Sequence, residues 1–116
     1  MGVFYLKSRD TRPTLQVQLL NPDNTVHDLT GTTTYKLHIK APSGTVSRDM
    51  IVVGALTNGT LAYSWVAADW DNLPLVTPNH QKDLQMEYEV IGPSTRLTFP
   101  NNGWDTLRIY GDIGQA

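Results

Sequence analysis

Short apolar runs with alternating polar residues, each ended by turn-forming residues, constrain the fold of this chain most strongly. In residues 33–40 and again in residues 83–90, apolar side chains occupy almost every second position. A period of two is the pattern of a strand with one buried and one solvated face. Turn signals such as Ala41-Pro42-Ser43-Gly44 and Asn58-Gly59 separate the runs. No helical stripe of comparable length is present, so the sequence predicts an all-β protein of about seven to eight short strands.

Two packed sheets are the expected architecture, with the alternating apolar positions on their inner faces. The strands are expected within residues 3–7, 14–20, 33–40, 45–53, 60–66, 83–90 and 96–99, with a last one around Leu107 and Ile109 and a short edge segment at residues 26–29. The predicted core consists of Leu15, Val17, Tyr35, Leu37, Ile39, Leu61, Tyr63, Trp65, Met86, Tyr88 and Val90.

Composition and length narrow the class of protein further. The chain has 116 residues, which favours a single β-sandwich domain over residues 1–116. Its net charge is −2, and no run of Lys and Arg is present, so we expect no nucleic-acid partner. Cysteine is absent, which removes disulfides and thiolate metal sites. No apolar run approaches the ~20 residues that span a bilayer, and no signal peptide is visible, so we expect no membrane partner.

Metal and cofactor chemistry has little support in the sequence. The three histidines, His27, His38 and His80, lack the spacing of metal ligands. The oxygen-bearing side chains of Asp69-Trp70-Asp71-Asn72 alternate as in a calcium loop but lack the glycine and distal glutamate of an EF-hand. The favoured interpretation is that Asp69 and Asp71 cap a turn, and we expect no metal and no cofactor.

Catalysis also lacks a convincing residue set, and the sequence predicts a protein that is not an enzyme. Glu87 and Glu89 share one face of a predicted strand, about 6.5–7 Å apart, near the separation that glycosidases use. Such pairs are common on solvated sheet faces. A glycan hydrolase is therefore only a third hypothesis.

The longest irregular stretch, residues 67–81, holds the candidate contact site. At roughly fifteen residues it is long for a connection in a compact domain, and such loops are often functional or mobile. A single helical turn is possible near residues 67–70. Trp70 is the best candidate for a sugar or protein contact, because a flat aromatic face stacks well. Asp69 and Asp71 flank it and complete the candidate site.

Several segments resemble the phage baseplate upper protein N-terminal domain family. Phe4-Tyr5-Leu6-Lys7 and Arg9-Asp10-Thr11-Arg12-Pro13 are similar to its opening strand and Gly-Asp-Thr-x-Pro turn, with Arg9 in place of the glycine. Asp28-Leu29-Thr30-Gly31 is similar to an internal segment of the family. Thr98-Phe99-Pro100-Asn101-Asn102-Gly103-Trp104 is similar to its terminal motif.

The same resemblance extends over most of the chain in the family's order. Gly59, Tyr63, Trp65 and then Asp69 fall where the family has a strand and an acidic turn, whereas residues 71–81 depart from it. The resemblance implies an immunoglobulin-like antiparallel β-sandwich from the tail of a siphophage that infects Gram-positive bacteria. It carries over no catalytic residue.

The first functional hypothesis is therefore a non-enzymatic structural or adaptor protein of a phage tail tip or baseplate. Its expected partners are other tail or baseplate proteins and further copies of itself, since free sheet edges often self-associate. The expected location is the virion, after synthesis in the host cytoplasm, with a place in host adsorption. The alternative is a host cell-wall carbohydrate or receptor-binding module that uses Trp70.

Overall fold

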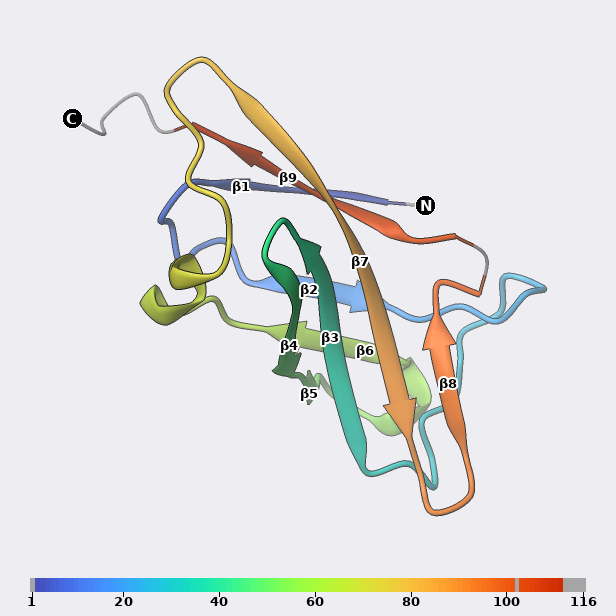
Figure 1. The fold of residues 1–116 in the computed structure, drawn as a ribbon. Coiled ribbons are helices and arrows are strands. Elements are labelled where there is room, and N and C mark those ends of the chain that lie inside the picture. Colours follow the sequence, from blue (N-terminus) through green and yellow to red (C-terminus); the bar gives the residue numbers. More distant parts are fainter. Residues whose placement is uncertain (1, 102, 112–116) are drawn as a thin grey trace.

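The computed structural model describes residues 2–101 and 103–111, and these residues form two packed β-sheets (Figure 1). The strands are β1 (Val3–Lys7), β2 (Leu15–Gln18), β3 (Thr34–Ala41), β4 (Gly44–Asp49), β5 (Ile51–Val52), β6 (Thr60–Tyr63), β7 (Gln81–Ile91), β8 (Arg96–Phe99) and β9 (Asp105–Tyr110), with short 3-10 turns η1 (Leu56–Asn58) and η2 (Ala67–Asp71). This arrangement confirms the predicted all-β sandwich. Within the described residues, no helix is long and apolar enough to cross a membrane.

The larger sheet has six strands, in the order β1-β9-β7-β3-β4, with β8 also paired to β7. Its strand pairs are antiparallel except for β1 and β9, which run parallel. The turn at Pro42-Ser43 closes the β3–β4 hairpin, with Ala41 opposite Gly44, as the sequence predicted.

Strands β8 and β9 share one edge of β7, and the Phe99–Trp104 motif lies between them. Tyr88 pairs with Phe99 and Met86 pairs with Asp105, so the two partners are two residues apart on β7 but six residues apart on the other chain segment. The motif is thus an excursion within one strand path rather than a turn between neighbouring strands. The Asn101 side chain donates a hydrogen bond to the Leu20 carbonyl (2.7 Å), so the excursion is tied to the end of β2. Asn102 lies outside the described residues.

The smaller sheet has three strands in the order β2-β6-β5, and after β3 and β4 the chain returns to it at Met50. The sequence predicted one strand over residues 45–53, and this was wrong. Strand β4 ends at Asp49 in the larger sheet, whereas β5 pairs with β6 in the smaller one. The Met50 N–H donates to the Tyr35 carbonyl (2.9 Å), and its buried side chain stays in the core. The change of sheet divides one apolar run into two short strands.

Two other predictions of local structure are corrected. Residues 26–29 form no strand, since only one isolated bridge joins Leu20 and Val26. The Asn58-Gly59 pair does not make a two-residue hairpin. Gly59 ends η1 with a φ of 61°, within a longer connection from β5 to β6.

The core lies between the sheets and contains the residues that the alternation predicted, although Val17 is only partly buried. Trp65 is central to it. Its ring packs edge-on against Tyr63, with ring centroids 5.2 Å apart, and lies 6.2 Å from Phe4. These contacts join the end of the smaller sheet to β1 of the larger one.

The turn after β1 holds Arg9 in a backbone conformation that favours glycine. The Asp10 N–H donates to the Lys7 carbonyl (3.0 Å) and closes the turn, and Arg9 has a φ of 70°. This is the left-handed region, which a glycine enters without steric cost. Arg9 therefore keeps the glycine-like backbone shape at a conformational cost.

We predict that Arg9→Gly raises the free energy of unfolding by about 0.5–1 kcal/mol, because it removes the steric cost of the left-handed conformation. Urea denaturation provides the measurement. Arg9→Ala is the matched control, since alanine removes the same side chain but keeps the Cβ. A loss of stability in Arg9→Gly as large as that in Arg9→Ala would show that the turn is not strained.

Candidate functional site

Residues 67–81 fold over one end of the sandwich, beside the end of β1 (Figure 1). Three apolar side chains of this loop are buried, namely Trp70, Leu73 and Val76. The Val76 N–H donates to the Ser8 hydroxyl (2.8 Å), which fixes the loop to the chain just after β1. The loop therefore closes the core at this end, and the helical turn expected near residues 67–70 is present as η2.

Asp69 is the centre of a buried polar cluster at this end. Its side chain is 1% exposed and accepts hydrogen bonds from Arg48 Nε (2.7 Å), the Tyr63 hydroxyl (2.7 and 2.9 Å) and the Val66 N–H (2.9 Å). A buried carboxylate needs such partners, because its desolvation is costly. Arg48 comes from the larger sheet, while Tyr63 comes from the smaller one. The carboxylate thus links both sheets to η2.

The same cluster shifts the ionisation of its donors. Burial, followed by the Asp69 carboxylate, raises the pKa of Tyr63 to about 12. The hydrogen bond to Asp69 raises the pKa of Arg48. The tyrosine therefore stays neutral and the arginine charged at physiological pH, which is the state that keeps every donor in place.

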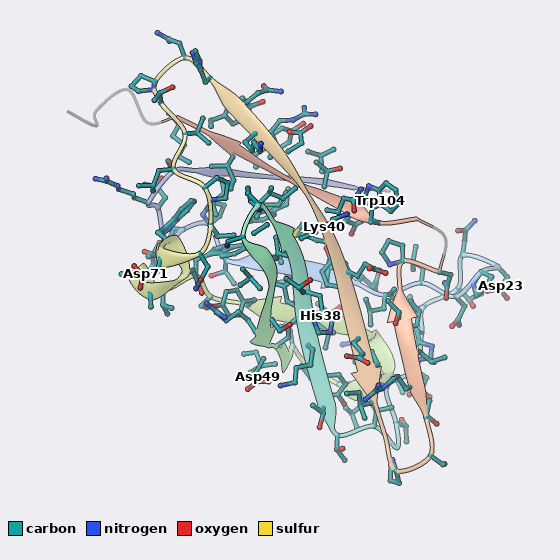
Figure 2. The ribbon with its side chains drawn as sticks, in the orientation of Figure 1. Asp23, His38, Lys40, Asp49, Asp71 and Trp104 are labelled. Carbon is teal, nitrogen blue, oxygen red and sulfur yellow. The ribbon has the colours of Figure 1, made fainter. Side chains whose placement is uncertain are left out.

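Trp70 and Asp71, the other two predicted site residues, have different surroundings. Trp70 is 8% exposed, and its Nε1–H donates to the Asp10 carbonyl (3.0 Å). Asp71 is exposed and lies on the η2 turn, remote from Trp104 (Figure 2). The structure thus brings Asp69 and Trp70 into the fold and leaves Asp71 on the surface. A partner contact at this loop stays a prediction. The Trp70 ring is buried and is not accessible for such a contact.

The three histidines lie apart and have separate surroundings. His27 Nδ1 is 2.8 Å from Asn21 Oδ1, and its ring packs 4.8 Å from that of Phe99. His38 lies between Ser47 and Glu89, whereas His80 is exposed near the start of β7. Among residues 2–101 and 103–111, no three His, Asp or Glu side chains gather to hold a metal ion.

Glu87 and Glu89 belong to the outer face of β7, as predicted, and Glu89 takes part in ion pairs. His38 Nε2 lies 2.9 Å and Arg96 Nε 3.0 Å from its two carboxylate oxygens. The hydrogen bond to His38 is the main cause that lowers the pKa of Glu89. A general acid of a glycosidase needs a raised pKa, so this environment does not favour that role.

Two aromatic side chains that the sequence analysis did not include in the candidate contact site, Tyr5 and Trp104, are exposed on the surface. Tyr5 is 53% exposed on the outer face of β1, and Trp104 is 46% exposed before β9 (Figure 2). The Tyr5 and Tyr110 rings stack, with centroids 6.1 Å apart and planes at 16°. The alternation in residues 3–7 carried this signal, because Leu6 points inward and Tyr5 must then point outward.

A comparison with solved structures gives a match over almost the whole chain. The N-terminal domain of phage TP901-1 ORF48 is similar to this protein, with a TM-score of 0.56 and 13% sequence identity, over 96% of this chain and 85% of that one. No protein-family model and no curated protein matches the sequence. At this identity the likeness shows a shared fold. It agrees with the phage-type fold that the motif resemblance implied.

We predict that Asp69→Ala lowers the free energy of unfolding by about 3–5 kcal/mol, because it leaves Arg48 and the Tyr63 hydroxyl without their buried acceptor. Urea denaturation followed by tryptophan fluorescence gives the value. Asp71→Ala is the control from the same turn, and as an exposed change it should stay within about 0.5 kcal/mol. Equal effects of the two variants would contradict the structural role of Asp69.

A pH dependence follows from Tyr63. Its pKa is higher in the folded chain, about 12, than the ordinary value near 10, so the folded state holds the proton longer. Its contribution to stability is complete below about pH 10 and is lost as the pH rises towards 12.

Wild type should therefore lose more stability between about pH 9 and pH 11 than Tyr63→Phe, which has no proton to lose. Urea denaturation at the two pH values makes the comparison. Because Tyr63→Phe also removes a hydrogen bond, the change between the two pH values is compared, not the absolute stability. Parallel losses in the two proteins would show that Tyr63 does not carry this dependence.

Proposed function

We propose that this protein is a non-enzymatic structural or adaptor component of a bacteriophage tail tip or baseplate. The supporting observation is the shared fold with the N-terminal domain of phage TP901-1 ORF48 over 96% of the chain. The motif resemblance to the phage baseplate upper protein N-terminal domain family points in the same direction. The expected location is the virion of a siphophage.

The sheets offer surfaces for contacts with other tail proteins or with further copies of this chain. In the described part of the chain, the edge strands are β1, β4 and β8 of the larger sheet and β2 and β5 of the smaller one. Ile51 on β5 is exposed, as is Val3 on β1. Edge strands with open backbone groups are common sites of strand addition. This arrangement supports assembly into a larger structure as the role of the domain.

The carbohydrate-binding alternative was based on Trp70, and the surroundings of Trp70 do not support it. Trp70 is buried and its indole N–H is used within the fold, so it has no free face for a sugar ring. The exposed large hydrophobic side chains in and next to this loop, Leu75 and Val66, are aliphatic. A saccharide site would therefore need aromatic rings elsewhere on the surface.

We predict that purified particles of the phage that encodes this chain contain it in a fixed ratio to the major tail protein. Quantitative mass spectrometry of gradient-purified, salt-washed virions measures this ratio, and immunogold labelling places the protein at the tail end. A lysis enzyme from the same lysate is the control for carry-over. Abundance in the lysate with absence from washed virions would overturn the structural role.

A further inference from the structure

The outer face of β1, β9 and β7 carries an ordered set of tyrosine and basic side chains. The strand registers place Tyr5 beside Arg108 and Asp83, and the next row holds Lys7, Tyr110 and Gln81. These side chains point outward, because Leu6, Leu107, Ile109 and Leu84 between them are buried in the core. The face is thus a small grid of aromatic, cationic and amide groups.

Arg108 holds the centre of this grid in place. Its guanidinium donates two hydrogen bonds to the Asp83 carboxylate (2.9 and 3.0 Å) and lies 5.9 Å from the centroid of the Tyr5 ring. The bond to Asp83 is the main cause that raises the pKa of Arg108. The Tyr5 ring also stacks with that of Tyr110, so it contacts both Arg108 and Tyr110.

Next to this grid, the surface has a hollow of about 300 Å³. Its lining consists of Lys7, Asn79, His80, Gln81, Tyr110 and Gly111. This volume is at the lower end of the range of about 300–1,000 Å³ that small-molecule pockets occupy. The hollow has the size for one ring-shaped unit of a ligand rather than for a protein surface.

The wall of the hollow is a tight turn with a clear cause in the sequence. Pro78 and Asn79 form its centre, Asn79 has a φ of 67°, and the His80 N–H donates to the Thr77 carbonyl (3.1 Å). Proline followed by a residue that tolerates positive φ is the pattern of a type II turn. Gly111 packs so closely on this turn that a Cβ there would overlap the Thr77 carbonyl. The wall is therefore formed before any ligand arrives.

The groups around the hollow match the chemistry of a charged sugar. The Tyr110 ring offers an aromatic wall for the C–H face of a sugar ring, and the amides of Asn79 and Gln81 can both donate and accept hydrogen bonds with hydroxyls. Lys7 and, when protonated, His80 supply positive charge for an anionic substituent.

The remainder of the outer face contrasts with this area. On β3, β4, β7 and β8, several charged groups are paired across strands: Lys36 with Asp49, and both His38 and Arg96 with Glu89. These pairs neutralise part of the charge of that area, whereas no ion pair involving Lys7 is found within the described residues. The positive charge beside the Tyr110 wall favours an anionic ligand.

We propose that this hollow binds a saccharide unit that carries a phosphate or carboxylate group. The sugar ring lies against Tyr110, the amides of Asn79 and Gln81 bond its hydroxyls, and the anionic group lies towards Lys7 and His80. The inference does not depend on the tail-structural role. If the protein is present in virions but binds no saccharide, only this inference fails. If it binds the saccharide but is absent from virions, only the tail-structural role fails.

Titration of the full-length protein with α-glucosyl phosphate, glucuronic acid, glucose and inorganic phosphate tests the proposal. Calorimetry measures affinity, and amide chemical shifts in NMR spectra locate the site. We expect saturable binding of one or both anionic sugars at least about tenfold tighter than glucose or phosphate alone, a difference of about 1.4 kcal/mol. Shifts should centre on residues 79–81 and Tyr110. Which anionic sugar binds distinguishes a phosphate from a carboxylate substituent.

Tyr110→Ala should lower the affinity for the anionic sugar at least about tenfold. Lys7→Gln should lower affinity for the anionic sugar and leave the weak binding of glucose unchanged. Trp104→Ala and Lys40→Gln, an exposed aromatic and an exposed lysine elsewhere, are the matched controls and should keep wild-type affinity. If circular dichroism shows that Tyr110→Ala is unfolded, Lys7→Gln decides.

Three results would overturn the proposal. The first is the absence of saturable binding of either anionic sugar. The second is binding of inorganic phosphate as tight as that of the sugar phosphate, which would indicate a simple anion site. The third is an affinity in Lys7→Gln equal to that of wild type.

Discussion

The buried carboxylate of Asp69 is the interaction on which this end of the sandwich depends. It accepts hydrogen bonds from Arg48 of β4 and Tyr63 of β6, which belong to different sheets, and from the backbone at the start of η2. Without that acceptor, a guanidinium and a hydroxyl would be left partly desolvated between the sheets. The position of η2 then directs Trp70 and the rest of the loop onto the end of β1.

The sequence predicted the features that depend on neighbouring residues. Alternation in β3 and β7 gave the faces correctly, and Pro42-Ser43 gave the hairpin. The change of sheet at Met50 and the excursion between Phe99 and Asp105 depend instead on pairing with distant strands. For the candidate site, the acidic and aromatic residues of the 67–81 loop indicated residues with a specific role, and the structure shows that Asp69 and Trp70 stabilise the fold. Their partners lie far away in the chain: Arg48 is 21 residues from Asp69, and Asp10 is 60 from Trp70.

The 67–81 loop closes the core with its large side chains, so the side chains best placed to contact other molecules lie on other elements. The outer face of the larger sheet has two areas, one with paired charges across β3, β4, β7 and β8 and one with tyrosines and an arginine across β1 and β9. The first area is typical of a solvated sheet. The second combines Tyr and Arg, the residue types that dominate recognition surfaces. The domain can therefore use its loop for stability and leave its sheet available for contacts.

A double-mutant cycle between Arg48 and Asp69 tests most directly whether the carboxylate joins the two sheets. The four proteins are wild type, Arg48→Met, Asp69→Ala and the double variant, and the free energy of unfolding of each is measured in urea. The account predicts a coupling energy of about 1–3 kcal/mol, because the buried Asp69 carboxylate forms an ion pair with the half-buried Arg48. Additive effects within about 0.3 kcal/mol would contradict it.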